Sequence, residues 1–582
     1  MGKVILAGAG PGDTGLLTLK AYKYIREADC LVYDRLMSPK LLELARTDCE
    51  LIYVGKENHK HVVNQDGINE ILFQKSKQHE LVLRLKGGDP YVFGRGGEEA
   101  LYLTERGVSV EVVPGVSSSI AALADAGIPI THRGVAKGFQ VITAHSRKDE
   151  EADIDYSLLT DETITCVFLM GLQHVESIAA GLMRAGRRED TPIAVISNGT
   201  LPTQNKCVGT LKNIGAKMKE AHLKSPAIIV AGDVVNMSDE LDFFEKRPLF
   251  GEKIIVPYIE DMDGVESQNR DESLMGVGFE SGGMTSGILP QDMAGYEIQG
   301  YGNRLVSSLE ELGADVLGVK VGRIQPVIVS DFEEQICSAD WFIFTSKNGV
   351  KSFFYNMKCA DVDVRKLAGC KFAVVGRHTA EELEKHNIYP DFIPDTATGE
   401  RLAKEFTESI LQSDNESSIE NVAGKRRMSS IENVAGKRRM STIGNVADKA
   451  SIVNQNVHKK SDNDVPVRVC LLAAKEASTD IENILGNHCD FHKVTAYENI
   501  ALPISSDIFE PIMESDGREI EAVFTSASNV RRMYGALPEQ LVISKAYSIG
   551  EKTTSALKEQ KAGQIIEAEE CSYEAILKEI IR

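Results

Sequence analysis

The chain has 582 residues, of which 42% are hydrophobic and 26% are charged, and its formal net charge is −21. This length predicts three or four globular units, and the apolar content is ample for buried cores. The negative charge argues against nucleic acid or a membrane surface as a partner, and an anionic substrate would need local basic clusters. No apolar run approaches the roughly 18–20 residues of a membrane span, and no signal peptide is expected, because the first apolar segment is a short strand.

The ten cysteines are scattered along the chain and form no CxxC pair. Zinc sites usually take their ligands from short, regular spacings, which are absent here. We therefore expect reduced cysteines, a cytoplasmic location and no bound metal.

Residues 1–245 alternate between strand-like and helix-like segments. Strands are expected at 4–8, 30–33, 51–54 and 81–85, and helices at 18–27, 39–47 and 65–77. A second set of strands, after residues 110–114, is expected at 140–143, 164–170, 193–197 and 227–231. This alternation predicts a largely parallel sheet with helices on both faces, arranged as two α/β lobes with a cleft between them. Pro114 and Gly115 mark the crossing between the lobes.

The most informative stretch is residues 85–99, which holds five glycines, a proline and several charges. Glycine and proline at this density exclude a regular helix or strand. The stretch follows a predicted strand and leads into a helix that begins near Gly96. A glycine loop at the carboxyl end of a strand lets the backbone approach a ligand, at the edge where open α/β sheets bind them. A purely structural turn is the alternative.

A second glycine turn, at residues 8–13, also follows a strand. Gly8 and Gly10 fit the dinucleotide-binding spacing GxGxxG, and Asp34 lies at the expected distance of about 20 residues. The third glycine position holds Asp13, which makes the motif weak on its own. A Rossmann-type oxidoreductase that binds NAD(P)H at residues 8–12 therefore remains an alternative.

Together, the two glycine segments resemble the signatures of the uroporphyrinogen-III C-methyltransferases, within the tetrapyrrole methylase family. Residues 1–245 resemble that family almost from end to end. The resemblance implies S-adenosylmethionine as the methyl donor, uroporphyrinogen III as the substrate and a possible homodimer through this domain. It also implies Asp34 as proton acceptor and Lys56 as proton donor. The alternatives are a strand-end cap for Asp34 and a surface lysine for Lys56.

The same resemblance implies a set of cofactor contacts that lie on the family motifs. They are Pro11, Gly87, Gly88, Asp89, Val92, Ser117, Ser118, Met170 and Gly199. The family substrate carries eight carboxylates, which basic side chains near these motifs would pair with. The candidates are Arg35, Lys60, Arg95, His132, Arg133 and Lys137.

Residues 250–582 also alternate between strands and helices. Strands are expected at 253–256, 340–345, 371–375, 468–473, 522–525 and 546–549. Two insertions interrupt the pattern, at 260–300 and 412–466, and the second contains a twelve-residue repeat, Ser417–Met428, that recurs at Ser429–Met440. The composition of both segments, and the low periodicity of the first, predict disordered insertions.

A longer pattern recurs within this half. Residues 344–350 recur as 524–530, and residues 374–380 recur as 548–554. Each is a strand followed by hydroxyl or amide groups that can cap the next helix, and each offers a helix N-terminus to an anion. Plain helix capping is the alternative interpretation.

These strand–turn patterns resemble uroporphyrinogen-III synthase. The resemblance implies two α/β lobes joined by a two-stranded linker near residues 325–327 and 497–503. It implies hydroxymethylbilane as the substrate, which closes to a ring with loss of water while one pyrrole inverts. The substrate contacts that it implies are Ser346, Tyr497, Ser526 and Thr553.

The sequence therefore predicts an α/β chain with a two-lobed methylase domain at 1–245 and a two-lobed synthase-like domain at 250–582. The expected function is bifunctional: cyclisation of hydroxymethylbilane to uroporphyrinogen III and double methylation to precorrin-2, for sirohaem or cobalamin. Alternatively, the C-terminal half is a non-catalytic module that binds substrate for the methyltransferase.

Overall fold

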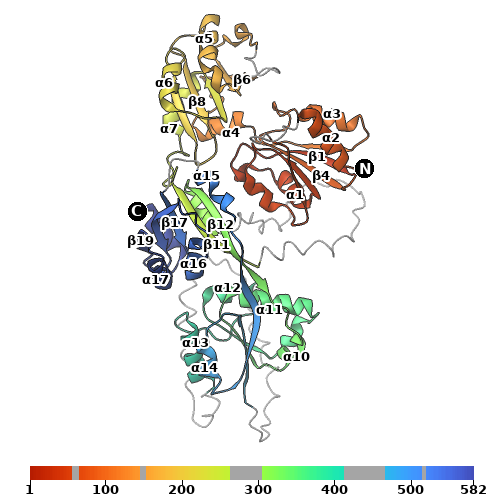
Figure 1. The fold of residues 1–582 in the computed structure, drawn as a ribbon, viewed down its shortest axis with the longest axis vertical. Coiled ribbons are helices and arrows are strands. Elements are labelled where there is room, and N and C mark those ends of the chain that lie inside the picture. The colour runs from red at the N-terminus through yellow and green to blue at the C-terminus, as the bar shows by residue number, and fades with distance from the viewer. Residues whose placement is uncertain (56–63, 145–152, 263–303, 412–465, 514–518) are drawn as a thin grey trace, which may run out of the picture. The chain divides into compact units, whose positions relative to one another are not determined.

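The computed structural model describes the chain except for residues 56–63, 145–152, 263–303, 412–465 and 514–518 (Figure 1). The predicted disordered insertions at 260–300 and 412–466 fall almost wholly outside the described residues. Lys56 and Lys60 also lie outside them. The described residues form two compact units. The first unit comprises Met1–Glu260, Gly264–Val321 and Leu502–Arg582, and the second comprises Asp261–Asp263 and Gly322–Ala501.

The first unit begins with a five-stranded sheet in the order β3-β2-β4-β1-β5, in which every neighbouring pair is parallel. Its strands are β1 (Lys3–Gly8), β2 (Cys30–Tyr33), β3 (Glu50–Tyr53), β4 (Leu81–Lys86) and β5 (Val110–Val113). One face packs on α1 (Leu19–Glu27), and the other is covered by α2 (Gln65–Lys75) and α3 (Gly96–Thr104) (Figure 1). The predicted parallel sheet with helices on both faces is confirmed here.

The helix predicted at 39–47 is instead the short 3₁₀ helix η2 (Pro39–Leu44). Its backbone closes i→i+3 bonds, from Leu41 N to Ser38 O and from Ala45 N to Leu42 O. An element this short gains few α-helical bonds, so the tighter turn is favoured.

A second five-stranded sheet has the order β6-β7-β10-β8-β9. Its strands are β6 (Gly138–Thr143), β7 (Ile164–Leu169), β8 (Pro192–Ser197), β9 (Asn205–Thr210) and β10 (Ala227–Ala231). Only β6 and β7 pair in parallel, so the prediction of a largely parallel sheet is wrong for this lobe. The connection at 198–204 is too short for the crossover that parallel strands need, and β9 was not predicted because its residues are mostly polar. The helices here are α4 (Ser118–Asp125), α5 (Val175–Ala185), α6 (Ile214–Ala221) and α7 (Ser238–Leu241).

The remaining residues of the first unit add strands to a nine-stranded sheet. They are β11 (Lys253–Glu260), the start of β12 (Asp315–Pro326), β17 (Glu519–Phe524), β18 (Val542–Ser548) and β19 (Gln564–Glu567). The accompanying helices are α9 (Arg304–Glu311), α15 (Glu510–Met513), α16 (Ala527–Tyr534), α17 (Glu551–Glu559) and α18 (Tyr573–Ile581). Their apolar side chains form clusters around Phe509, Phe524 and Tyr547.

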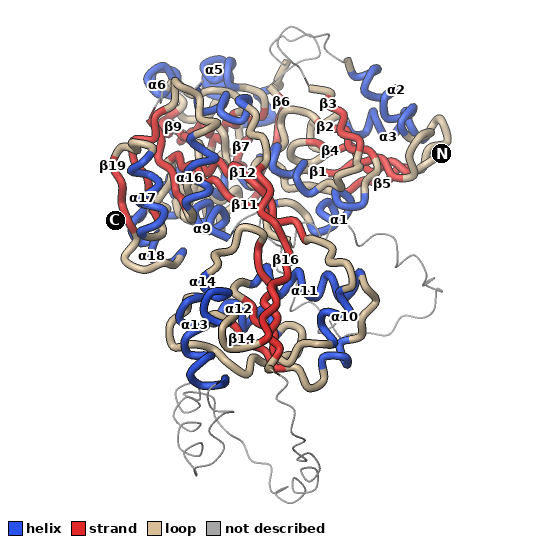
Figure 2. The backbone as a smooth tube through the Cα atoms, turned by 60° about the horizontal axis from the view of Figure 1, so that its bottom comes forward, coloured by secondary structure: helices blue, strands red, loops and turns tan. Residues whose placement is uncertain are grey.

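The second unit carries β13 (Trp341–Phe344), β14 (Lys371–Val374), β15 (Arg468–Ala474), β16 (Asp490–Ala501) and the end of β12. Its helices are α10 (Phe332–Cys337), α11 (Lys347–Cys359), α12 (Arg377–Glu384), α13 (Gly399–Phe406) and α14 (Asp480–Leu485). The end of β12 pairs antiparallel with β16, from Gly322 opposite Ala501 to Pro326 opposite Tyr497 (Figure 2). This pair coincides with the two linker passages that the synthase resemblance implies.

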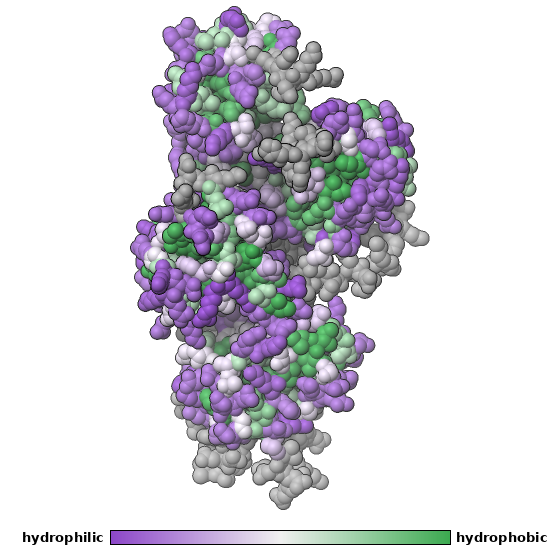
Figure 3. Space-filling model, in the orientation of Figure 1, coloured by the Kyte–Doolittle hydropathy of each residue, from purple (hydrophilic) through white to green (hydrophobic). Residues whose placement is uncertain are grey.

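The surface agrees with the acidic, polar composition. Hydrophilic residues predominate on the face drawn in Figure 3, with smaller apolar patches among them. In the part of the chain that the structure describes, no helix has the length and apolar character needed to cross a bilayer. Nine of the cysteines are described with their side chains, and none of these forms a disulfide.

Candidate active sites

Three glycines at strand ends of the first sheet form what we call the glycine cradle: Gly8, Gly88 and Gly115. A Cβ atom on Gly8 would lie 2.5 Å from the Gly88 carbonyl oxygen, and one on Gly115 would lie 2.1 Å from the same atom. Gly88 N donates to Gly10 O at 2.7 Å, and both residues have positive φ. A Cβ at Gly8 or Gly115 would clash with backbone, so glycine at these positions lets three segments pack backbone against backbone at the carboxyl edge of the sheet.

Asp89 holds the cradle together. One carboxylate oxygen accepts from Tyr91 N at 2.7 Å, and the other accepts from Gly115 N at 3.0 Å. Gly87 packs against Leu36, where a Cβ would lie 2.8 Å from the leucine Cβ. The loop predicted from residues 85–99 therefore has a defined shape, stabilised by its own carboxylate.

The other predicted cofactor residues lie on two further turns. Ser117 caps α4, accepting from Ser119 N at 3.3 Å, and Ser118 is the first residue of that helix. The β1 turn that contains Pro11 contacts the turn after β8, because Asp13 N donates to Thr200 Oγ1 at 3.1 Å. Gly199, in that second turn, packs against α4. The structure thus brings the turns of Pro11, Ser117 and Gly199 to neighbouring places.

Two predicted apolar contacts are more exposed. Val92 lies in the glycine-rich loop, and Met170 follows β7 with a positive φ. Val92 is 37% exposed and Met170 is 51% exposed, so part of each residue is open to solvent.

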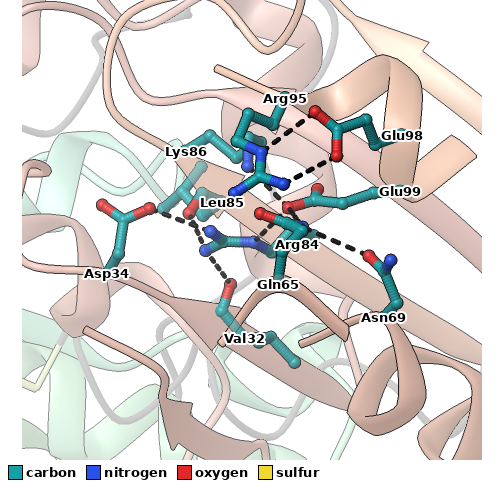
Figure 4. A network of polar contacts seen from close by, with 10 residues as sticks. All are labelled: Val32, Asp34, Gln65, Asn69, Arg84, Leu85, Lys86, Arg95, Glu98 and Glu99. Carbon is teal, nitrogen blue, oxygen red and sulfur yellow. Dashed lines mark hydrogen bonds and ion pairs between the residues drawn. The ribbon is translucent and has the colours of Figure 1, made fainter. Parts of the chain in front are cut away.

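Asp34 comes directly after β2, at the same carboxyl edge as the cradle. Its Oδ2 accepts from the Arg84 guanidinium at 2.9 Å, and its Oδ1 accepts from Leu36 N at 3.1 Å (Figure 4). The side chain is 23% exposed. Both carboxylate oxygens of Asp34 thus accept a hydrogen bond from the protein, while the side chain remains partly exposed. The predicted partner Lys56 lies outside the described residues.

The arginine that holds Asp34 belongs to a buried charge network that the sequence did not predict. Glu99 Oε1 accepts from Lys86 Nζ at 2.7 Å and lies 3.6 Å from Arg84 Nε. Burial is the main cause that lowers the pKa of the Lys86 amine, and the neighbouring Arg84 lowers it further. Alternation along β4 indicates that Arg84 and Lys86 share a face, but it does not indicate that this face is buried.

One group among the described residues has metal-binding chemistry: Cys30, Glu50 and His79 lie close together. Glu50 already pairs with His79 and with Lys75. Burial raises the pKa of the Cys30 thiol to about 12, which disfavours the thiolate that a metal requires. We therefore interpret this group as an ion-pair cluster.

In the second unit, the predicted residues Ser346 and Tyr497 are joined directly. Their hydroxyl oxygens lie 2.8 Å apart, and Ser346 also caps α11 by accepting from Gly349 N at 3.2 Å. Tyr497 lies on β16, and burial raises the pKa of its phenol. The pair places two hydroxyls at one helix N-terminus.

In the first unit, Ser526 repeats this arrangement. It caps α16 by accepting from Asn529 N at 3.2 Å, as Ser346 caps α11. Thr553 is buried in the first turn of α17. The repeat that relates residues 344–350 to 524–530 is therefore a repeat of structure, with a strand, a serine cap and a helix each time.

Comparison with known proteins assigns both halves. The family of Tetrapyrrole (Corrin/Porphyrin) Methylases matches residues 3–215, and Uroporphyrinogen-III synthase HemD matches residues 303–443 and 450–578. The chain is 32% identical over 587 residues to the porphyrin biosynthesis protein HemD of Ruminiclostridium josui, covering 100% of this chain and 98% of that protein. The chain belongs to the tetrapyrrole methylases that are fused to a uroporphyrinogen-III synthase.

Two further relatives match the N-terminal part of this fused enzyme. The uroporphyrinogen-III C-methyltransferase of Methanocaldococcus jannaschii is 49% identical over 240 residues, which cover 41% of this chain and 98% of that protein. The crystal structure of the uroporphyrin-III C-methyl transferase from Thermus thermophilus, complexed with S-adenyl homocysteine, is 40% identical. It covers 40% of this chain and 99% of its own, with a TM-score of 0.35.

The strand order also separates this fused methylase from the oxidoreductase alternative. Here β1 lies between β4 and β5, whereas the dinucleotide-binding fold places its first strand between the second and the fourth. Asp13, at the third glycine position, accepts from Gly15 N at 2.7 Å and begins a 3₁₀ turn. The glycine turn at residues 8–12 therefore belongs to a different sheet topology.

Proposed function

We propose that this chain catalyses two consecutive steps of tetrapyrrole synthesis. A synthase domain at residues 250–582 closes hydroxymethylbilane to uroporphyrinogen III, and a methylase domain at residues 1–245 converts that product to precorrin-2, for sirohaem or cobalamin. The observation that carries the methylase assignment is the position of Asp34, a held but accessible carboxylate beside the glycine cradle. Consecutive steps on one chain suit an intermediate that is easily oxidised.

S-adenosylmethionine fits the methylase site. Within the glycine cradle, a Cβ on Gly88 would meet no atom within 4 Å, so there is room beside the backbone of Gly88. We propose that Gly87, Gly88 and Asp89 bind it from the loop, and that Val92 and Met170 supply apolar contacts. The remaining residues of the proposed cofactor site are Pro11, Ser117, Ser118 and Gly199.

When bound, S-adenosylmethionine supplies a methyl group on a positively charged sulfur. Each transfer forms one C–C bond and breaks one C–S bond, whose electron pair stays on sulfur, and the substrate then loses one proton. Asp34 accepts that proton, and Lys56 acts as the proton donor of the site. General acid–base groups of this kind contribute about 10²–10⁴ to the rate.

In the synthase domain, ring closure releases one water molecule while one pyrrole inverts. Four hydroxyl side chains at or near helix N-termini bind the substrate carboxylates. They are those of Ser346, Tyr497, Ser526 and Thr553. A helix N-terminus stabilises an anion through its free N–H groups and its dipole. These residues therefore fold the linear substrate, and few side chains need to transfer protons.

The test supplies hydroxymethylbilane to the full-length protein without oxygen, with and without S-adenosylmethionine, and separates products by isomer and mass. We expect uroporphyrinogen III without the donor and a dimethylated product with it. The Asp34→Asn variant should stop at uroporphyrinogen III. If only uroporphyrinogen I forms, by spontaneous closure, the C-terminal half is the non-catalytic binding module. If supplied uroporphyrinogen III is not methylated either, the methylase assignment is wrong.

We also propose that the enzyme is a cytoplasmic homodimer that associates through its methylase domain and binds neither nucleic acid nor membranes. The resemblance to the methylase family supports the dimer. Light scattering of the purified protein should then give the mass of two 63.7-kDa chains. A mass of one chain at micromolar concentration would contradict the dimer.

A further inference from the structure

The central strand of the first sheet carries two buried cations. Val82, Arg84 and Lys86 alternate onto the face of β4 that α2 and α3 cover, and Val82 packs in the apolar cluster there. Arg84 is 2% exposed and Lys86 is 5% exposed. Lysine and arginine are almost never fully buried unless they are paired, because removal from water is costly. Both positions would ordinarily hold apolar residues.

The ion pairs offset the cost of burying these charges, but a gain in folding stability does not explain why charged residues occupy these positions. Two anions, Asp34 and Glu99, neutralise the two cations. Replacing a buried ion pair with apolar residues of similar volume is often neutral or stabilising. The network therefore needs another reason, and its open end provides one: Asp34 is partly exposed, whereas Glu99 is 0% exposed.

Arg84 contacts two backbone carbonyls through one nitrogen and a carboxylate through each of the other two. Its Nη1 donates to Leu85 O at 3.0 Å and lies 3.4 Å from Val32 O. Its Nε faces Glu99 at 3.6 Å. The remaining nitrogen, Nη2, donates to Asp34 (Figure 4). Because the guanidinium is planar and rigid, the carbonyl contacts of Nη1 and the charge of Glu99 beside Nε restrict where Nη2, and with it the Asp34 carboxylate, can sit.

Glu99 anchors the inner end of the network. It lies in the first turn of α3, where the helix dipole stabilises a carboxylate. Its Oε1 accepts from Lys86 at 2.7 Å and from Gln65 Nε2 at 3.1 Å, so it is tied to both β4 and α2. The network thus joins two helices and the central strand to one accessible carboxylate.

We propose that Arg84 is a positioning residue that holds Asp34 in the orientation needed to accept the substrate proton. This inference rests on the proposed role of Asp34 as proton acceptor. Proton transfer needs heavy atoms about 2.6–3.2 Å apart, and a misplacement of about 1 Å can cost roughly 100-fold in rate. Arg84 touches neither substrate nor cofactor in this proposal and acts only through Asp34.

The test is a double-mutant cycle on the full-length enzyme supplied with uroporphyrinogen III, following the first methyl transfer. Arg84→Met should lower kcat by about 10- to 100-fold and leave the KM for S-adenosylmethionine within about twofold. In the Asp34→Asn background, the same change should lower kcat by less than about threefold. A residue that acts through Asp34 loses its effect once that carboxylate is gone.

A matched control separates positioning from general loss of stability. Arg187 is also buried, at 3% exposed, and donates to the carbonyls of Leu159, Asp161 and Ile164. Arg187→Met should lower the unfolding temperature yet leave kcat per folded molecule unchanged. If Arg84→Met does not fold, Arg84→Lys replaces it and should show the same dependence on Asp34, with a smaller loss.

The outcomes distinguish the acceptor role of Asp34 from the positioning role of Arg84. If Asp34→Asn keeps its activity, the acceptor role of Asp34 fails, and the positioning role of Arg84 fails with it. If Asp34→Asn is impaired but the Arg84 variants are fully active, only the positioning role fails. An equal fold-loss from the Arg84 change in both backgrounds would also overturn it, because Arg84 would then act independently of Asp34.

Discussion

The glycine cradle makes a sharp prediction for Gly115→Ala. A Cβ there would lie 2.1 Å from Gly88 O and 2.7 Å from Gly8 Cα, although real Cβ contacts essentially never fall below 3.0 Å. Both opposing atoms are backbone, so no side chain can rotate away and the loop after β4 must move. Overpacking of this kind costs about 1–3 kcal/mol. At about 2–4 °C per kcal/mol, the unfolding temperature of the methylase part should fall by about 2–12 °C.

Calorimetry on the full-length protein measures both consequences, the unfolding temperature and the affinity for S-adenosylmethionine. We expect Gly115→Ala to weaken binding as well as stability, because the displaced loop carries the proposed cofactor contacts. Gly97→Ala is the matched control: its Cβ would meet no atom within 4 Å, and within α3 the change should stabilise by about 0.5–1 kcal/mol. Native stability and affinity in Gly115→Ala would refute the close approach of the strand ends.

Three further predictions concern single contacts. Tyr497→Phe removes the 2.8 Å hydrogen bond to Ser346, which should destabilise the second unit by about 0.5–1.5 kcal/mol. The ratio of uroporphyrinogen III to uroporphyrinogen I among the products should fall, whereas methylation of supplied uroporphyrinogen III should be unchanged. Thr200→Val leaves Asp13 N without its acceptor and should lower the free energy of unfolding, measured by thermal unfolding, by about 1–3 kcal/mol. Burial raises the pKa of the Asp125 carboxyl to about 6, so its ionised form is penalised in the folded state and stability falls as pH rises toward 6. Asp125→Asn should therefore raise the unfolding temperature at pH 8 but not at pH 4; an equal change at both pH values would contradict this.

The sequence predicted the first sheet because its strands are mostly apolar and a helix separates most of them, which favours parallel neighbours. It failed for the second sheet because strand direction there depends on one short connection, at 198–204, and on the polar strand β9. The long strands β12 and β16 also have mixed, partly exposed faces, so their composition alone did not separate them from loops. The family resemblance implied a linker near 325–327 and 497–503, which overlaps only the carboxyl-terminal ends of these two strands.

The candidate site divides in a similar way. The family resemblance implied Gly88 as a cofactor contact, and Gly115 was expected only at the crossing between the lobes. Their close approach to each other was not predicted. The partner of Asp34 was not found, since Arg84 lies 50 residues away and nothing local marks it as buried. Charged residues in a strand ordinarily indicate a solvent-exposed face. Only the strand order, which places β4 in the middle of the sheet, reverses that interpretation.

The central position of β4 in the sheet also explains why charges and glycines follow one another at the end of this strand. The inward side chains of Arg84 and Lys86 fix two carboxylates, one of them at the sheet edge. The chain must then turn sharply, and glycine lets its backbone pass within contact of β1 and β5. Asp89 finally ties the turn to Gly115. A change anywhere from Arg84 to Asp89 should therefore disturb both the proposed proton acceptor and the proposed methyl-donor site, whereas changes in α1 should disturb neither.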